Sequence, residues 1–134
     1  MRLLTHNYLQ SNVKGTEKGY PLQIEATKVE YDESPCDVGF IRTLVTKIDY
    51  ESLRSAMTQL SPICVTDLAS DLTLPELPES LPPPTDYEES LLQSLHTVLM
   101  DIHVVEGHLV CPDTGRRFNI SMGIPNMILH EDEI

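Results

Sequence analysis

The residues with the clearest chemical signal form the turn Cys111-Pro112-Asp113-Thr114-Gly115, close to the C-terminal end of the chain. A Cys-Pro-x-x-Gly turn that leads into an alternating strand is typical of the knuckles that present thiolates to a metal ion. Structural zinc is bound by four ligands at tetrahedral spacing, and Thr114 stands where the second thiolate of such a knuckle would be. The residues therefore predict the scaffold of a metal site without enough ligands to hold the ion.

Two other uses of this turn are conceivable from the residues alone. A site made by His108, Cys111 and Asp113 would lack a fourth protein ligand. A nucleophilic Cys111 would need a neighbouring base and a setting that stabilises its thiolate; the simpler interpretation is a small apolar side chain that fills space at a turn. The other cysteines, Cys36 and Cys64, share no repeated spacing with it, so all three are expected to be reduced thiols.

No other set of residues predicts catalysis. The five histidines have no metal-binding spacing, and the order of residues suggests no Ser-His-Asp arrangement. His96 is interpreted as a packed residue in the middle of a helix. The six glycines include no phosphate-binding loop. The sequence therefore predicts a protein that is not an enzyme and that carries no cofactor of its own.

The charge of the chain is strongly negative and unevenly distributed. The 134 residues carry a formal net charge of -12, and no lysine or arginine occurs from Ser55 to Gly115. Because nonspecific affinity for nucleic acids depends on lysine and arginine contacts to phosphate, direct binding of RNA or DNA is not expected. No run approaches the roughly 20 apolar residues of a membrane span, so we expect no membrane partner and a cytoplasmic and nuclear location.

Hydrophobic periodicity predicts strands at both ends of the chain and helices in the middle. Apolar residues alternate with polar ones over 21–31 and within 103–129, which favours strands. Helical spacing recurs over 37–60 and 87–102. Six prolines and unpaired acidic residues lie in 61–84, where we expect a solvated, extended loop.

The expected fold is therefore α+β. It combines a ribbon-like β sub-domain, made by residues 1–34 and 103–134, with a helical insertion over residues 35–102 that contains the proline-rich loop. Three local features are also expected: a short strand over 2–4, a hairpin turn at Glu106-Gly107, and a frayed acidic tail over 130–134.

Apolar residues cluster around a strand that contains proline. Pro125 has no N–H to donate to a central ladder, so its strand must lie at an edge or contain a bulge. Exposed edges pair with strands of other proteins, but the same side chains could equally close the core of this chain, and the pattern leaves both interpretations open. The apolar residues concerned are Ile120, Met122, Ile124, Met127 and Ile128.

Two arginines, Arg116 and Arg117, end the long stretch without positive charge. They could pair with acidic residues of this chain, or they could attract an acidic partner. The sequence alone does not separate these alternatives.

Three segments together resemble one family. They are MRLLTHN at the start, YPLQIEATKVE in the first predicted strand region, and VVEGHLVCPDTGRRFNISMGIPNMIL at the end. They are similar to the small activator subunit of class I methyltransferases, also called the multifunctional methyltransferase subunit or tRNA methyltransferase activator. The resemblance extends over nearly the whole chain, except for the proline-rich stretch.

The resemblance implies a zinc-ribbon-like β sub-domain from both termini with a central helical domain. Some members of the family bind zinc through four cysteines. The matching positions here are Ser11, Thr16, Cys111 and Thr114, so three of the four ligands are replaced. The resemblance therefore implies a member that holds no metal.

The resemblance also implies a non-catalytic role. The subunit binds class I methyltransferase catalytic subunits as heterodimers, and S-adenosylmethionine is expected in the partner. Clients in the family modify tRNA, ribosomal RNA and a translation release factor. An alternative is a zinc-free ribbon that acts as an adaptor in transcription or ribosome assembly, without a methyltransferase client.

The edge-strand pattern and the family motifs together suggest a contact set for such a partner. An edge strand would extend the sheet of the partner, and apolar side chains would seal an exposed patch on it. The proposed contact residues are Thr5, His6, Asn7, Phe118, Ile120, Met122, Ile124, Pro125 and Met127.

Overall fold

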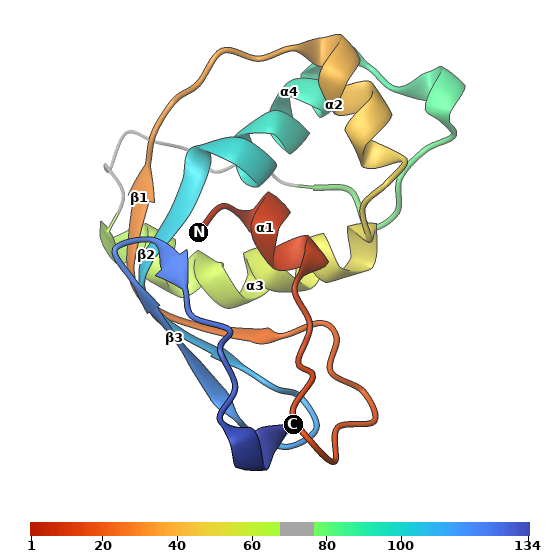
Figure 1. Cartoon of the computed structure of the whole chain (residues 1–134). Coiled ribbons are helices and arrows are strands. Elements are labelled where there is room, and N and C mark those ends of the chain that lie inside the picture. The colour runs from red at the N-terminus through yellow and green to blue at the C-terminus, as the bar shows by residue number, and fades with distance from the viewer. Residues whose placement is uncertain (68–76) are drawn as a thin grey trace.

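The computed structural model describes residues 1–67 and 77–134. Its sheet is antiparallel with the strand order β1-β2-β3-β4, and the helices gather over one part of it (Figure 1). This arrangement confirms the predicted α+β class. The strands are β1 (Gln23–Tyr31), β2 (Ile102–Val110), β3 (Arg117–Ser121) and β4 (Ile124–Pro125). The α-helices are α1 (Leu3–Tyr8), α2 (Val38–Val45), α3 (Tyr50–Asp67) and α4 (Glu89–His96).

Short turns complete the helical elements. A π-helical turn, η2 (Thr97–Asp101), continues α4 directly into β2. Two 3₁₀ turns, η1 (Pro84–Asp86) and η3 (Glu131–Glu133), lie before α4 and near the end of the chain. The helix predicted over 87–102 is thus present, but its last turn, η2, is wider than that of an α-helix.

The strands form where the sequence alternates, because alternate side chains reach the same core. In β2, Ile102 and Val104 follow this alternation and are buried. The phase then changes, since Ile24 and Val29 of β1 and Val104 and Leu109 of β2 are buried five residues apart, where the pairing shifts register between Ala26 and Val29. Helix α3 packs against β1.

A side chain of α3 also satisfies the backbone of β1, since the Ile24 N–H donates to Oε1 of Gln59 over 2.5 Å. The core is one cluster that includes residues from the sheet and from all four α-helices. The sub-domain boundaries stay a prediction.

The chain begins differently from the expected strand over 2–4. Only Arg2 makes a β-bridge, to His103, and a helix begins at Leu3. Leu3, His6 and Asn7 recur at helical spacing and are buried. His6 Nε2 bonds to the carbonyl of Leu22 over 2.7 Å.

The prediction of a hairpin turn at Glu106-Gly107 is wrong, because β2 runs without a break from Ile102 to Val110. Its pairing with β1 is irregular here, with register shifts between Ala26 and Val29. Gly107 has φ +149°, and a Cβ atom there would lie 2.3 Å from the carbonyl oxygen of Glu25. The glycine is therefore needed for close strand approach rather than for a turn.

The proline-rich loop expected over 61–84 begins later than predicted. Helix α3 continues through Pro62 to Asp67, so residues 61–67 are helical. Residues 68–76 lie outside the described part of the chain. Residues 77–83 form neither helix nor strand, in agreement with the expectation.

The frayed acidic tail expected over 130–134 is also wrong. Residues Glu131–Glu133 form η3, and the Glu133 carboxylate accepts two hydrogen bonds from the Arg116 guanidinium, of 2.6 and 3.2 Å. Arg116, followed by the backbone of His130, lowers the pKa of Glu133 to about 2. The Lys14 N–H also donates to the Glu133 carbonyl over 2.6 Å. The tail is thereby tied to the knuckle and to the N-terminal loop.

Changing Gly107 to alanine tests the close approach of β1 and β2. We expect Gly107→Ala to lower the free energy of unfolding by roughly 3 kcal/mol or more, because the added Cβ both strains φ and overlaps Glu25. Chemical denaturation measures this. The matched control is Gly39→Ala in α2, where the new Cβ meets only a side-chain oxygen at 3.5 Å. Equal unfolding energies for the two variants would contradict this account.

Candidate functional site

The structure brings the four positions of the degenerate metal knuckle together. The Thr16 hydroxyl lies 3.8 Å from the Cys111 sulfur, and the Thr114 N–H donates to that sulfur over 3.4 Å. Ser11 is buried, and its hydroxyl finds no hydrogen-bond partner among the described oxygen and nitrogen atoms. The four residues therefore form one polar cluster around a single thiol, which we call the knuckle cluster.

Backbone contacts hold the two halves of the knuckle cluster in place. The Ser11 N–H donates to the Gly19 carbonyl over 2.8 Å, and a Cβ at Gly19 would lie 2.1 Å from the Ser11 carbonyl oxygen. On the other side, Asp113 Oδ2 accepts from the N–H of Glu17 over 2.6 Å. These contacts of the chain itself fasten the N-terminal loop to the turn.

The environment of Cys111 favours its thiolate. Burial by itself raises the pKa of this thiol, but the neighbouring Ser11 hydroxyl, together with hydrogen bonds from Thr114 and the backbone of Asp113, outweighs burial, and the pKa falls to about 6. Hydrogen bonds to a charged group favour the charged form. At neutral pH the knuckle therefore holds a thiolate that donors of this chain stabilise.

The donor set does not suit zinc. One thiol with three hydroxyl-bearing residues falls short of the cysteine and histidine ligands that structural zinc takes. Within residues 1–67 and 77–134, no group of three or more His, Cys, Asp or Glu is placed to hold a metal ion. The alternative set of His108, Cys111 and Asp113 is therefore not assembled either.

The knuckle cluster predicts how stability depends on pH. In the folded state the pKa of Cys111 is about 6, below the ordinary value of 9.0. The Cys111 thiolate therefore contributes its full stabilisation of the folded state above about pH 9. This contribution disappears as the pH falls through 6. Between these values the free energy of unfolding should rise by up to about 1.4 kcal/mol per pH unit from this group.

The test measures the free energy of unfolding of Cys111→Ser and of the unchanged chain between pH 6 and 9. The difference between the two values at each pH gives the contribution of Cys111. Cys36→Ser is the matched control, since Cys36 is exposed. The assignment of a stabilised Cys111 thiolate would be contradicted if this difference did not change with pH, or if Cys36→Ser gave the same pH dependence.

A Ser-His-Asp cluster is present although the sequence did not suggest one. Ser34 Oγ lies 3.1 Å from His96 Nε2 and donates to Asp101 Oδ1 over 2.6 Å. His96 Nε2 also lies 3.4 Å from the same Asp101 oxygen. In a catalytic triad the serine and the aspartate contact different nitrogens of the histidine, whereas here they share one.

Both His96 and Asp101 are buried. The cluster therefore ties the segment after β1 to the π-helical turn η2, and we assign it no catalysis. His96 is a packed helix residue, as the sequence predicted.

The edge of the sheet at β4 is open. A two-residue turn joins β3 to β4, and the Asn126 N–H donates to the Asn119 carbonyl over 2.8 Å. Ile120 and Pro125 between them form a non-hydrogen-bonded pair, so the Pro125 carbonyl points away from β3. The next outward donor, the N–H of Met127, has no partner among the described residues. This confirms that Pro125 lies at an edge.

Apolar side chains are exposed beside this edge. Met122 is 83% exposed and Ile124 is 70% exposed. Met122 has φ 53°, which is uncommon outside glycine, and its N–H donates to Glu106 Oε1 over 3.2 Å. The turn thus holds a large apolar side chain in water.

The structure divides the predicted contact set. Thr5 is exposed like Met122 and Ile124, and Pro125 and Met127 are half-buried. Four members are buried in the core of this chain instead: His6, Asn7, Phe118 and Ile120. Their side chains pack inside this chain, so their role as direct contacts stays a prediction. In the free chain these four side chains pack beneath the exposed residues of the set.

One exposed residue of the predicted apolar cluster lies outside the predicted contact set. Ile128 is 77% exposed and lies directly after Met127. Its position in the same apolar run was the available signal. We define the docking edge as Met122, Ile124, Pro125, Met127 and Ile128.

The two arginines pair within the chain. Arg116 binds Glu133 and lies over the ring of Phe118, 4.7 Å from its centroid. Arg117 pairs with Glu25 across the sheet. The alternative that they attract an acidic partner receives no support from these contacts.

Aspartate substitutions at Ile120 and Ile124 test which of the two side chains is part of the core. Ile120→Asp should cost more than about 3 kcal/mol of unfolding free energy, because it buries a charge without a partner. Ile124→Asp should change this energy by less than about 0.5 kcal/mol, since the side chain is exposed. Thermal or chemical unfolding measures both. The assignment fails if the two variants are destabilised alike.

The fold and the site together define a class. The chain is a zinc-ribbon-like α+β protein whose knuckle lacks the four ligands of a zinc site and whose sheet edge presents apolar side chains. In the described ranges no helix is both long and apolar enough to cross a membrane.

The family follows from comparison of the sequence. Residues 2–123 match the model of the family described as Trm112p-like protein. The chain belongs to this family. The multifunctional methyltransferase subunit TRM112 homolog B of Arabidopsis thaliana is 42% identical over 136 residues, which is 100% of both chains. The TRM112-like methyltransferase subunit of Mus musculus is 36% identical over 134 residues, covering 99% of this chain and 98% of that protein.

A solved structure has the same fold. A chain of the E. cuniculi Mtq2-Trm112 complex superposes with a TM-score of 0.58 at 18% identity, covering 96% of this chain and 95% of that chain. That complex is described as responsible for the methylation of the translation termination factor eRF1. At this identity the likeness shows the fold alone.

Proposed function

We propose that this chain is a non-catalytic subunit that binds S-adenosylmethionine-dependent methyltransferases as a heterodimer and stabilises them. The observation that carries the proposal is the docking edge, where exposed Met122 and Ile124 flank an open strand edge. Membership of the Trm112p-like family and relatives named as methyltransferase subunits support it. The cofactor would be bound by the partner.

The mechanism combines backbone pairing with apolar burial. A strand of the partner would donate to the Pro125 carbonyl and accept from the Met127 N–H. Main-chain hydrogen bonds tolerate different side chains, so partners of different sequence could use the same edge. Burial of each apolar side chain would add roughly 1.5–3 kcal/mol.

Stabilisation follows from mass action, because the subunit would bind the folded partner and not its unfolded chain. The proposed clients act on tRNA, on ribosomal RNA and on a translation release factor. The net charge of -12 supports the proposal that the partner, rather than this chain, binds the nucleic acid. A cytoplasmic and nuclear location would bring the subunit to such clients.

Affinity purification with mass spectrometry tests the proposal. The unchanged chain should recover methyltransferase catalytic subunits. The double variant Met122→Glu/Ile124→Glu should lower their recovery about 100-fold or more, because two apolar contacts are replaced by charges. Phe40→Glu is the matched control, since Phe40 is also exposed but lies on α2.

The outcomes separate the proposal from its alternative. If the unchanged chain recovers no methyltransferase but components of transcription or ribosome assembly, the adaptor function is correct. If Phe40→Glu abolishes recovery and the double variant does not, methyltransferases bind at the helices and the docking edge is the wrong surface.

A further inference from the structure

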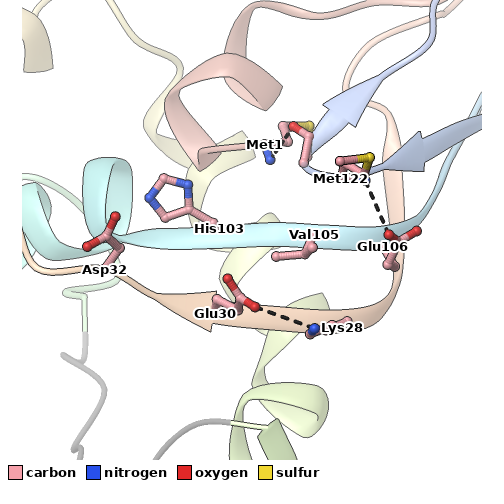
Figure 2. A pocket seen from close by; sticks show the side chains of 9 residues that line it. Met1, Lys28, Glu30, Asp32, His103, Val105, Glu106 and Met122 are labelled. Carbon is pink, nitrogen blue, oxygen red and sulfur yellow. Dashed lines mark hydrogen bonds and ion pairs between the residues drawn. The ribbon is translucent and has the colours of Figure 1, made fainter.

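The amino group of Met1 lies against the turn that carries the docking edge. Met1 is 5% exposed, and it belongs to the core cluster. Its nitrogen donates to the carbonyl oxygens of Val104 and Gly123, both over 2.7 Å. Figure 2 shows Met1 on the same side of β2 as Met122. One nitrogen atom therefore joins β2 to the β3–β4 turn.

The two bonds of the Met1 nitrogen differ in kind. Met1 and Val104 exchange both backbone hydrogen bonds, since the Val104 N–H also donates to the Met1 carbonyl over 2.8 Å. This is the pattern of a hydrogen-bonded pair in an antiparallel ladder. A peptide nitrogen has a single hydrogen, which this pairing would use. The bond to Gly123 exists because an amino group carries at least two N–H donors, whether or not it is protonated.

The turn that receives this second bond has an unfavourable backbone conformation. Met122 and Gly123 are the two residues between β3 and β4, with φ of 53° and 78°. Positive φ at both positions is typical of a type I′ hairpin turn, for which Asn-Gly is a favoured sequence. Met122 lacks the short polar side chain that makes Asn tolerable there. Such a conformation persists only where the surrounding structure holds it.

Hydrogen bonds to β2 and to Met1 hold the turn. Glu106 Oε1 accepts from the Met122 N–H over 3.2 Å, and the Val105 carbonyl accepts from the Gly123 N–H over 2.9 Å. The Met1 amino group adds its bond to the Gly123 carbonyl. The bond to Glu106 is exposed to solvent, whereas Met1 is fixed by its place in the core. The amino group therefore ties the turn to the core.

The conformation of this turn decides how the docking edge is presented. Met122 lies in the turn, and Ile124 follows it directly and pairs with Ser121 across it. A change in the turn would therefore move both exposed side chains relative to β3. Binding is weakened when a contact surface must first be ordered. A turn that is held by Met1 presents these side chains already in place.

We propose that the Met1 amino group is a positioning group of the docking edge. This inference rests on the proposed function. A group attached to the nitrogen, either an acetyl group or a further residue, converts the amine into an amide with one N–H. The pairing with Val104 uses that hydrogen, so the bond to Gly123 is lost. Binding of the methyltransferase partner then weakens, although no side chain has changed.

The Met1 nitrogen has space beside it for such a group. Met1 and Gly123 line a hollow of about 550 Å³, to which Val105 and Met122 also contribute (Figure 2). An acetyl group or one further residue can extend into this hollow. The modified chain is therefore expected to keep its core.

The test compares three forms of the chain with the unchanged protein. One is acetylated at the Met1 nitrogen, and a second has one glycine before Met1, which makes the same change from amine to amide. The matched control has one glycine after Ile134, whose side chain is 78% exposed. Intact mass confirms each form.

Amide hydrogen exchange examines the turn without any partner. Exchange of the Gly123 N–H should become roughly fivefold to tenfold faster in both forms modified at Met1, because one hydrogen bond to the turn is lost. The internal reference is the Cys111 N–H, which donates to the Arg116 carbonyl over 2.8 Å at the other end of β3. Unchanged exchange at Gly123, or an equal increase at Cys111, would overturn the inference.

The variant Met122→Asn separates positioning of the turn from general stability. Its turn has the Asn-Gly sequence that favours positive φ at both positions, so the turn should hold its conformation without the amino group. Acetylation should then leave the exchange of the Gly123 N–H unchanged. If acetylation speeds this exchange equally with Met122 and with Met122→Asn, the amino group does not position the turn and the inference is wrong.

Binding is measured by surface plasmon resonance with the methyltransferase subunit that the unchanged chain recovers. Both modifications at Met1 should raise Kd roughly fivefold to tenfold, whereas the glycine after Ile134 should change Kd by less than about twofold. Equal Kd for the free and the acetylated amino group would overturn the inference and leave the proposed function intact. Recovery of no methyltransferase by the unchanged chain would instead overturn the proposed function.

Discussion

The rest of the structure depends on the pairing of β2 with both ends of the chain. On one side β2 pairs with β1, in a register that runs from Gln23 with Val110 to Tyr31 with Ile102. On its other side β2 pairs with β3. Further along that same side of β2, the Val104 N–H donates to the Met1 carbonyl, and the Met1 amino group donates to the Val104 carbonyl. One strand thus joins segments a hundred residues apart. The helices, the knuckle cluster and the docking edge take their positions from it.

The knuckle cluster shows how contacts of the chain itself join the two segments of a zinc-ribbon-like knuckle. Hydrogen bonds to the Cys111 sulfur, and the bond between the Asp113 side chain and the N-terminal loop, fasten the same two segments that a tetrahedral ion would join. The pair of Arg116 with Glu133 adds a second fastening from the C-terminal turn. The Asp113 bond joins residues far apart in the sequence at one end of β3, and the β3–β4 turn with exposed Met122 lies at the other end of that strand.

Much of this architecture could be predicted from residue patterns. Period-2 alternation located β1, helical spacing located α2, α3 and α4, and the proline at position 125 indicated an edge. The errors have specific causes. The glycine at position 107 permits close strand approach, which cannot be told from a turn without the partner strand. Pro62 continues a helix because the opposite face of α3, with Leu53 and Leu60, is buried against the sheet.

The sequence by itself determined the fold class, the family and the absence of a complete zinc ligand set, because alternation, motifs and ligand types are local properties. Only the tertiary structure decided which apolar residues face water. Ile120 and Ile124 are equally apolar and four residues apart, yet one lies in the core and the other on the surface. The turn at Met122 and Gly123 reverses the chain between them. Which side of the sheet a residue joins depends on neighbours distant in sequence.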